Sequence, residues 1–343
     1  MIAVVDPYGV SGDSALPELG SALTPSAAER ELGAALKDRF RRVELAAIRV
    51  IRYKPQRRCL VEYDLAVESL DGEAERFTAI GKVRAKRHGK SGLRLLTALR
   101  KAGFDERAAD GICVPEPLGH LPAFRMWLQR KVAGVEVAAL LADASGPELA
   151  RRVAAAAAKV HRAGIPTERW HRMEDELRIL HDCVPRVAQQ RPEWAGRIER
   201  LLSACVRLGR SVPEPTYAGI HRDFYAQQIL VSGGRLYLLD FDLYCAGNPG
   251  LDVGNFAGHI AEEALRVHGS ASALAGVERA LEDRFCELSG EQARAAVRAY
   301  ARLTLVRHVY LSAILPGRGE VTGALLEHCE QQLLIERTTL RSI

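Results

Sequence analysis

Hydrophobic and polar positions in the first third of the chain alternate with the period of β-strands, and helical patterns lie on either side. Two short joins between the strand patterns, at 54–58 and 71–73, contain Pro or Gly and are typical of hairpin turns. The strand patterns cover residues 43–54, 58–68, 76–84 and 125–132, and the helical patterns cover residues 25–42 and 90–103. This part of the chain predicts an antiparallel sheet with one or two helices.

After about residue 135 the hydrophobic period changes to that of α-helices. The helical patterns cover residues 146–163, 174–190, 194–209, 255–267, 271–289, 291–314 and 322–340. A strand-rich island at 216–243 interrupts them. We therefore predict an α+β protein in three parts: a loosely docked leader at 1–24, a β-sheet lobe at 25–128 and a larger, mainly helical lobe at 129–343.

The composition is that of a globular protein, since 48% of the 343 residues are hydrophobic and 27% are charged. No apolar run reaches the roughly 18–20 residues that cross a bilayer, and the first residues do not resemble a secretion signal. The seven cysteines are scattered without a Cys-x-x-Cys pair, which argues against a zinc or redox motif and for a reducing compartment. We expect a soluble, cytoplasmic protein without a membrane partner.

The charge is unevenly distributed along the chain. Residues 37–101 contain 18 Lys and Arg against 8 Asp and Glu, whereas the whole chain carries only +5, so the remainder is acidic. A basic segment indicates a site for the phosphates of a nucleotide or a nucleic acid, although a solvated basic surface has the same composition. The acidic remainder argues against a protein that lies along DNA and suits a cationic small molecule.

The island and the residues after it, 220–254, hold the most informative polar groups. Two apolar strand patterns flank a glycine turn, and this hairpin would bring Asp223 to the same edge as Asp240 and Asp242. The amide of Gln228 lies in the same segment. Converging carboxylates beside an amide oxygen suit the coordination of a hard cation and the acceptance of a proton from a hydroxyl group.

These motifs resemble those of the aminoglycoside phosphotransferase and choline kinase family, which is related to the protein kinases. The family's catalytic loop, His-x-Asp-x-x-x-x-Asn, is similar to residues 221–228, and its Ile-Asp-(Phe/Trp)-(Glu/Asp) motif is similar to 239–242. A Gly-x-Pro-x-x-Asp-(Leu/Val) element follows at 247–253. The resemblance extends to about residue 314 and implies a protein-kinase-like fold with a cleft between the two lobes. It also implies ATP-dependent transfer of the γ-phosphate to a hydroxyl group of a small molecule.

The resemblance implies a role for each polar residue of the island. Asp223 matches the catalytic base that takes the proton of the attacking hydroxyl. Asp240 matches a ligand of Mg²⁺, and Gln228 stands where the family usually has Asn as a second ligand. His221 and Asp252 are expected to brace the loop through hydrogen bonds more than they touch substrate. Arg222 replaces a smaller residue and is grouped with these supporting residues, and Asp242 is expected either to contact metal or substrate or to have a structural role.

In the sheet lobe, Lys82 matches the third-strand lysine that pairs with the α- and β-phosphates. The family's glycine-containing loop over the phosphates is replaced by side-chain cations, which are Lys54, Arg57 and Arg58. Trp127 and Gln129 match the connection whose backbone meets adenine. The acidic partner of Lys82 is missing from its usual helix, because residues 83–104 contain no Asp or Glu. The remaining candidates for that partner are Glu62, Asp64, Glu73, Glu75 and Glu106.

The motifs do not identify the acceptor. Residues 166–190 contain five acidic residues, with Trp170 among them and Trp194 nearby, where the family builds its acceptor pocket. These residues suit an amine-bearing alcohol such as an aminoglycoside or a choline-like compound, sugars are also candidates, and an exposed helix face would have the same composition. Two other hypotheses are a nucleotide-binding pseudokinase without phosphotransfer, and a nucleic-acid-binding module that would leave the acidic island unexplained and that we do not favour. We predict no oligomeric state.

Overall fold

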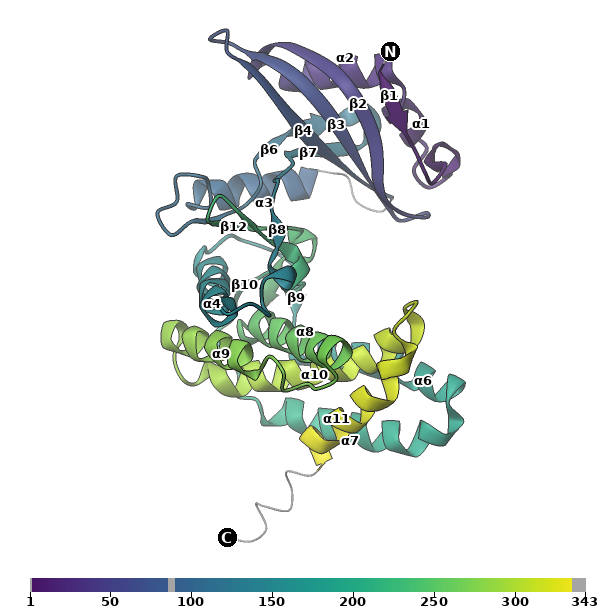
Figure 1. The fold of residues 1–343 in the computed structure, drawn as a ribbon, viewed down its shortest axis with the longest axis vertical. Helices are drawn as coiled ribbons and strands as arrows, with labels where there is room; N and C mark the ends of the chain where they lie inside the picture. Colours follow the sequence, from purple (N-terminus) through teal and green to yellow (C-terminus); the bar gives the residue numbers. More distant parts are fainter. Residues whose placement is uncertain (1, 86–89, 335–343) are drawn as a thin grey trace. The chain divides into compact units, whose positions relative to one another are not determined.

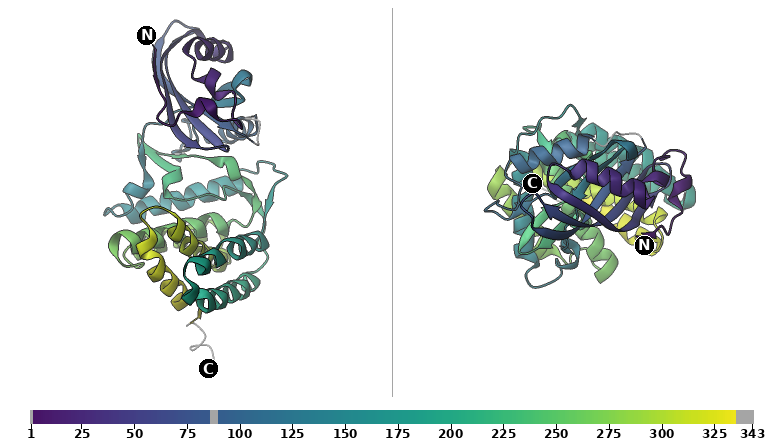
Figure 2. Two further views of the ribbon diagram at one scale, coloured as in Figure 1. Left: turned by 90° about the vertical axis from the view of Figure 1, so that its right-hand side faces the viewer. Right: turned by 90° about the horizontal axis from the view of Figure 1, so that it is seen from above.

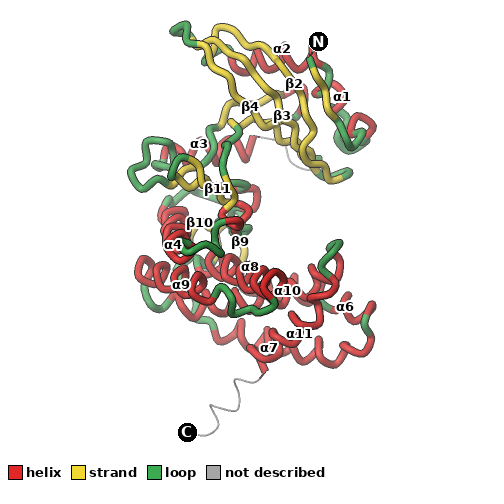
Figure 3. Tube along the Cα trace, in the orientation of Figure 1, coloured by secondary structure: helices red, strands yellow, loops and turns green. Residues whose placement is uncertain are grey.

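The computed structural model describes residues 2–85 and 90–334, which form two compact units (Figure 1). The first, called the sheet unit here, comprises Met1–Gly134 and Ser232–Leu239. The second, called the helical unit, comprises Val135–Val231 and Asp240–Ile343. The sheet-rich and helix-rich parts confirm the predicted α+β class (Figure 3). Among the described residues, no helix combines the length and the apolar character needed to span a membrane.

The sheet unit is built on a six-stranded sheet with the strand order β1-β2-β3-β4-β7-β6. Its strands are β1 (Ala3–Val5), β2 (Phe40–Lys54), β3 (Arg58–Ser69), β4 (Ala74–Arg84), β6 (Pro117–Leu121) and β7 (Met126–Arg130). All neighbours are antiparallel except β1, which runs parallel to β2. Its helices are α1 (Leu19–Ala22), α2 (Pro25–Leu36) and α3 (Lys90–Lys101), and the short strands β5 (Ile112–Cys113) and β12 (Arg235–Leu238) pair in parallel. The three long strand patterns of the sequence are thereby confirmed.

One face of this sheet forms the hydrophobic core of the unit. Because side chains alternate along a strand, Cys59, Val61 and Tyr63 of β3 share this face with Val83 of β4, and all are at most 2% exposed. The core continues into the first residues of the chain and into α2. In Figures 1 and 2 these N-terminal elements, at the purple end of the colour bar, lie beside the sheet.

The first 24 residues differ from the loosely docked leader that the sequence predicts. Strand β1 pairs with residues 47–49 of β2, and Val10, Leu16 and Leu19 are at most 1% exposed in the core of the sheet unit. Their spacing is irregular, so the hydrophobic period did not reveal that they are core residues. The segment is nevertheless an integral part of the sheet unit.

The helical unit contains eight α-helices among its described residues. They are α4 (Gly146–Arg162), α5 (Met173–Cys183), α6 (Pro185–Gln190), α7 (Ala195–Ser211), α8 (Gly250–His268), α9 (Ala275–Ser289), α10 (Ala293–Ile314) and α11 (Thr322–Leu334). The pattern at 174–190 forms two helices because Pro185 cannot continue α5. The unit also has a three-stranded sheet of β10 (Ala218–Ile220), β13 (Cys245–Gly247) and β9 (Trp170–His171), and a pair of β8 (Val135–Glu136) with β11 (Ile229–Ser232).

Helices α8 and α10 pack unusually closely because α8 presents glycine to α10. A Cβ atom at Gly254 would lie 2.6 Å from the carbonyl oxygen of Val297, and one at Gly258 would lie 2.8 Å from that of Ala301. Only glycine allows this approach, so the two helices form a rigid pair. Helix α8 begins at Gly250, earlier than the pattern at 255–267 predicts, and its first turn therefore contains Asp252.

Candidate active site

The predicted nucleotide-binding side chains of the sheet unit share one face of its sheet, opposite the core. Lys54 of β2 pairs with Arg58 of β3, and Arg58 pairs with Arg84 of β4. Lys82 lies two residues before Arg84 and pairs with Trp127 of β7. Residues that are directly opposite, or two apart along one strand, lie on the same face. The register therefore brings these five side chains to one surface.

Two more of the predicted nucleotide-binding residues lie on or close to this surface. One cation on the surface, Arg84, was not predicted. Gln129 lies two residues after Trp127, so it shares the face, and it is 5% exposed. Arg57 lies in the turn between β2 and β3, where its backbone carbonyl accepts a hydrogen bond from the N–H of Ala85 over 3.1 Å. The spacing of two between Arg84 and Lys82 is the signal that would have found it.

Lys82 is held by an aromatic ring. Its Nζ lies 5.0 Å from the centre of the Trp127 ring, within the range of a cation–π interaction. Helix α3 packs on the other part of this ring, because a Cβ atom at Gly92 would lie 2.9 Å from Trp127 Cε2. Trp127 is therefore fixed between the lysine and the helix.

The predicted acidic partners of Lys82 bind other cations. Glu62 binds Lys131 over 2.6 Å and Arg49 over 3.2 Å, and Asp64 binds Arg49 over 2.6 Å. The other acids pair with the cations Arg130 (Glu75) and Arg100 (Glu106), and Glu73 lies exposed in the β3–β4 turn. Among the described residues of the sheet unit, Lys82 has no carboxylate within ion-pair distance.

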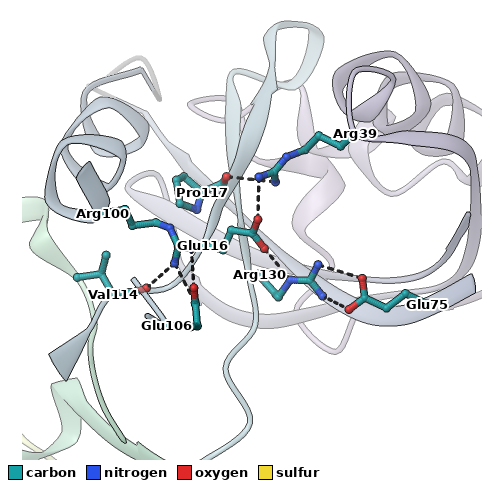
Figure 4. A network of polar contacts seen from close by, with 8 residues as sticks. All are labelled: Arg39, Glu75, Arg100, Glu106, Val114, Glu116, Pro117 and Arg130. Carbon is teal, nitrogen blue, oxygen red and sulfur yellow. Dashed lines mark hydrogen bonds and ion pairs between the residues drawn. The ribbon is translucent and has the colours of Figure 1, made fainter. Parts of the chain in front are cut away.

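Strand β7, which carries Trp127 and Gln129, is fixed by a network of ion pairs (Figure 4). Arg130 donates to Glu75 over 2.6 Å and to Glu116 over 2.8 Å. Glu116 also accepts a hydrogen bond from Arg39 over 2.7 Å. Because the carboxylate of Glu116 joins two arginines from different elements, the network resists displacement of the end of β7.

In the helical unit, a fully buried carboxylate holds the segment before Asp223. Asp252 is 0% exposed and accepts hydrogen bonds from the backbone N–H groups of His221 (2.8 Å) and Arg222 (2.7 Å). It is also 2.9 Å from Nε2 of His161 on α4. Arg222 has a φ of 70°, in the left-handed region that non-glycine residues rarely adopt, and the hydrogen bond from its N–H stabilises this conformation. Asp252 therefore fixes the backbone of the two residues that precede Asp223.

Packed aromatic rings, tilted or edge-on to one another, connect this loop to the segment that contains Asp240. The ring of His221 is buried, and its centre lies 4.5 Å from that of Phe241 and 5.6 Å from that of Phe224. Phe241 follows Asp240, whose φ of 55° is again left-handed. The next predicted residue, Asp242, accepts a hydrogen bond at its backbone carbonyl from Arg169 over 2.8 Å. Asp223 itself is half-buried between β10 and the 3₁₀ turn at 226–228.

The amide of Gln228 has a defined orientation. Its Nε2 donates to the hydroxyl of Tyr225 over 2.9 Å, which leaves Oε1 as the acceptor atom. The Tyr225 ring stacks on His259 with 4.7 Å between ring centres, and His259 meets His308 edge-on at 4.5 Å. Burial lowers the pKa of His308 to about 3 and that of His259 well below its usual value, so both rings are neutral at physiological pH.

The oxygen atoms of Asp240 and Gln228 are of the kind that binds a hard cation together with phosphate oxygens. Among the described residues, no group of three or more His, Cys, Asp or Glu side chains is arranged to hold a metal ion. Mg²⁺ bound with nucleotides, however, usually takes one or two protein ligands and completes its shell with phosphate oxygens and water. The carboxylate of Asp240 and Oε1 of Gln228 are oxygen donors of the required kind.

A second network, missed by the sequence analysis, supports the same loop from α8 and α10. Asn255 donates to the carbonyl oxygen of Phe224 over 2.9 Å and accepts from Arg307 over 2.6 Å. Arg307 lies 3.5 Å from Glu176, which is 2.6 Å from Nε2 of His171. Burial opposes ionisation of Glu176, but the hydrogen bond to His171 and the charge of Arg307 outweigh it and lower its pKa.

Residues 166–190, the acidic stretch predicted to line the acceptor pocket, therefore include both buried and exposed side chains. Glu176 is buried in that network, and Asp175 accepts the backbone N–H of Arg172 at the start of α5 over 2.8 Å. Trp194 packs at the edge of the core. Trp170, by contrast, is 53% exposed and meets the ring of Tyr217 edge-on at 5.4 Å.

Comparison with solved structures shows that several small-molecule kinases share this fold. A glucosamine kinase in complex with glucosamine, ADP and inorganic phosphate has a TM-score of 0.56 at 16% identity, over 93% of this chain and 89% of that chain. A mutant aminoglycoside phosphotransferase in a ternary complex with ADP and hygromycin B has a TM-score of 0.54 at 14% identity, over 90% of this chain and 96% of that chain. An ethanolamine kinase of Plasmodium vivax has a TM-score of 0.52 at 12% identity, over 86% of this chain and 83% of that chain. The architecture is protein-kinase-like, as predicted.

The sequence profile of the phosphotransferase enzyme family matches residues 76–300. The chain belongs to this family, so the predicted family and enzyme class, a phosphotransferase that acts on hydroxyl groups of small molecules, are confirmed. No curated protein sequence matches the chain.

Proposed function

We propose that this chain is an ATP- and Mg²⁺-dependent kinase of a cationic, hydroxylated small molecule, with Asp223 as its catalytic base. The main support for this proposal is the carboxylate of Asp252, which accepts hydrogen bonds from the backbone N–H groups of the two residues before Asp223. A proton acceptor for phosphoryl transfer has to be positioned accurately, since such transfer depends mainly on positioning and charge stabilisation.

The cationic face of the sheet supports the nucleotide end of the proposal. Lys54, Arg58 and Arg84 are directly opposite one another on three adjacent strands and form a row of cations. Phosphate oxygens would bind to such a row through charge-assisted hydrogen bonds. Lys82 on the same face would bind the α- and β-phosphates, and the backbone near Trp127 and Gln129 would meet adenine.

Asp240 and Gln228 are the residues that would hold Mg²⁺, which would neutralise charge on the β- and γ-phosphates when bound. Gln228 is one methylene longer than the family's Asn, and because its amide nitrogen donates to the Tyr225 hydroxyl, Oε1 is the atom that would bind the metal. In the transfer, the acceptor oxygen bonds to the γ-phosphorus while the bond to the ADP oxygen breaks. The hydroxyl proton passes to the carboxylate of Asp223.

The acceptor class is supported by exposed aromatic and acidic side chains near the start of the loop. Tyr217 immediately precedes β10, which leads into His221, and the Tyr217 hydroxyl donates to Glu214 over 2.6 Å. Trp170 already holds a cation on its face, because the Arg172 guanidinium lies 5.3 Å from the ring centre. Such a cluster suits an ammonium group of an amino alcohol or amino sugar. Glucosamine, hygromycin B and ethanolamine, named with the solved kinases above, belong to these classes.

The proposal is tested by incubating the protein with Mg·ATP and a panel of amino sugars, aminoglycosides, amino alcohols and neutral sugars. Mass spectrometry should detect the gain of one phosphate group on at least one cationic acceptor, with matching ADP release. A parallel panel with GTP checks the donor. Phosphorylation of neutral sugars alone would overturn the proposed acceptor class.

One observation favours a second candidate, a nucleotide-binding pseudokinase. Lys82 contacts an aromatic ring and has no carboxylate partner among the described residues of the sheet unit. The two candidates differ in turnover, since the pseudokinase would bind Mg·ATP without phosphorylating any acceptor in the panel. A cytoplasmic location and the absence of nucleic-acid partners stay predictions.

A further inference from the structure

The tip of the β2–β3 hairpin, residues 54–58, is held by a carboxylate from outside the hairpin. Asp13 is 8% exposed, and one of its oxygens, Oδ2, accepts both the hydroxyl of Tyr53 (2.8 Å) and the backbone N–H of Gln56 (2.7 Å). Its other oxygen accepts the N–H of Ala15 over 2.8 Å. A single side chain therefore joins the N-terminal segment to two residues of the hairpin.

The bond to Gln56 fixes an unfavourable backbone conformation. Gln56 has a φ of 56°, in the left-handed region where side chains other than glycine are disfavoured. Such a conformation persists only where the surroundings hold it. Within the turn, the N–H of Arg57 donates to the carbonyl oxygen of Lys54 over 3.0 Å, and Asp13 adds a hydrogen bond from outside the turn at the strained residue itself.

Asp13 is itself anchored. It lies between Val10 and Leu16, which are 0% and 1% exposed in the core. The ring of Tyr8 lies 6.0 Å from that of Tyr53, which adds a second contact between the segment and the hairpin. Burial opposes ionisation of Asp13, but the hydrogen bonds from Gln56, Tyr53 and Ala15 outweigh it and lower its pKa. The carboxylate therefore stays charged at physiological pH.

The contact comes from the side of the hairpin that faces the core. Tyr53 pairs with Cys59, whose side chain is fully buried, whereas Lys54 and Arg58 point to the opposite face. Asp13 therefore contacts the tip from the core side, and the cations of the tip lie on the other face.

We propose that Asp13 is a positioning residue that holds the hairpin tip in the shape in which Lys54, Arg57 and Arg58 bind nucleotide phosphates. The inference rests on the proposed function, because it assigns the phosphates to this face. It also gives the N-terminal segment, which lies outside the region matched by the family profile, a part in nucleotide binding. An external carboxylate thus replaces the flexible glycines that such loops otherwise use.

The test compares Asp13→Ala with Asp6→Ala in the full chain. Asp6 is a matched control, because it accepts the N–H groups of Tyr8 (3.1 Å) and Val10 (2.8 Å) within the same segment. Asp13→Ala should weaken Mg·ATP binding, measured by calorimetry, about tenfold and accelerate amide exchange at residues 54–58 by a similar factor. Its kcat at saturating nucleotide should stay within about twofold of wild type, since the tip acts through binding.

Tyr53→Phe keeps the tight turn around Asp13 and removes one bond, so it tests the inference even if Asp13→Ala fails to fold. It should weaken Mg·ATP binding about threefold, and Asp13→Asn should lie between wild type and Asp13→Ala. Equal effects of Asp13→Ala and Asp6→Ala, or unchanged affinity in Tyr53→Phe, would overturn the inference alone. A wild-type protein that binds no Mg·ATP would overturn the proposed function as well.

Discussion

The catalytic loop of the helical unit and the hairpin tip of the sheet unit share one local device in different settings. In each, a non-glycine residue has a left-handed backbone, Arg222 with φ 70° and Gln56 with φ 56°. In each, its N–H donates over 2.7 Å to an aspartate that is distant in the sequence. The aspartate is Asp252 at 0% exposure in one case and Asp13 at 8% in the other.

The settings differ in rigidity. Asp252 lies in α8, which packs against α10 without intervening side chains at Gly254, and it receives three hydrogen bonds from two further elements. Asp13 lies in an irregular segment anchored by a few apolar side chains. The comparison indicates that the residue expected to take the proton rests on a rigid support, while the loop expected to cover phosphates rests on one that opens more easily.

The largest effect is expected for Asp252→Ala. It leaves the buried N–H groups of His221 and Arg222 and the ring of His161 without their acceptor, at about 1–3 kcal/mol each. We expect the free energy of unfolding in urea to fall by about 3–5 kcal/mol. The exposed Asp182→Ala on α5 should change it by less than about 0.5 kcal/mol. A loss for Asp252→Ala no larger than that for Asp13→Ala would contradict the difference in rigidity.

A partly buried carboxylate with an unpaired oxygen should behave in the opposite way. Glu278 on α9 has an oxygen with no hydrogen-bond partner among the described residues, and burial raises its pKa from 4.5 to about 7. The folded chain therefore binds the proton more tightly than the unfolded chain, and stability declines as the pH rises from about 4.5 to 7. Glu278→Gln should be more stable than wild type by about 1–3 kcal/mol at pH 8 and similar to it at pH 4.

The measurement is chemical denaturation at both pH values, with the exposed Glu287→Gln on the same helix as the control. A Glu278→Gln variant that is less stable than wild type at pH 8 would show that this carboxylate has a stabilising role that the structure does not explain.

A smaller effect is expected where a ring, in place of a carboxylate, holds Lys82, the side chain proposed to bind the α- and β-phosphates. Trp127→Leu removes the aromatic face from Lys82, which is worth about 0.5–2 kcal/mol, so the KM for ATP should rise about two- to thirtyfold. Trp127→Phe keeps a ring and should retain most of the affinity. If both variants behave alike in steady-state kinetics, the ring is not what positions Lys82.

The sequence predicts those features that repeat locally or follow a motif. The long strands follow from the alternation of side chains, and the approach of Asp252 to His221 follows from the resemblance, since both lie in matched motifs. The bond from Asp13 to Gln56 spans 43 positions and joins an irregular segment to a turn, so neither a period nor a motif reveals it. The same holds for Asn255 and Arg307, which interact through side chains on two packed helices.

The most direct test of the account is the rate of phosphate transfer by Asp223→Asn, assayed with Mg·ATP and the best acceptor from the panel. The variant keeps the size of the side chain but cannot take the proton, so kcat should fall by roughly 10²–10⁴-fold, about 3–5 kcal/mol of barrier. Its affinity for Mg·ATP should change by less than about threefold. Transfer at the wild-type rate by a folded Asp223→Asn protein would contradict the assignment of Asp223 as the base.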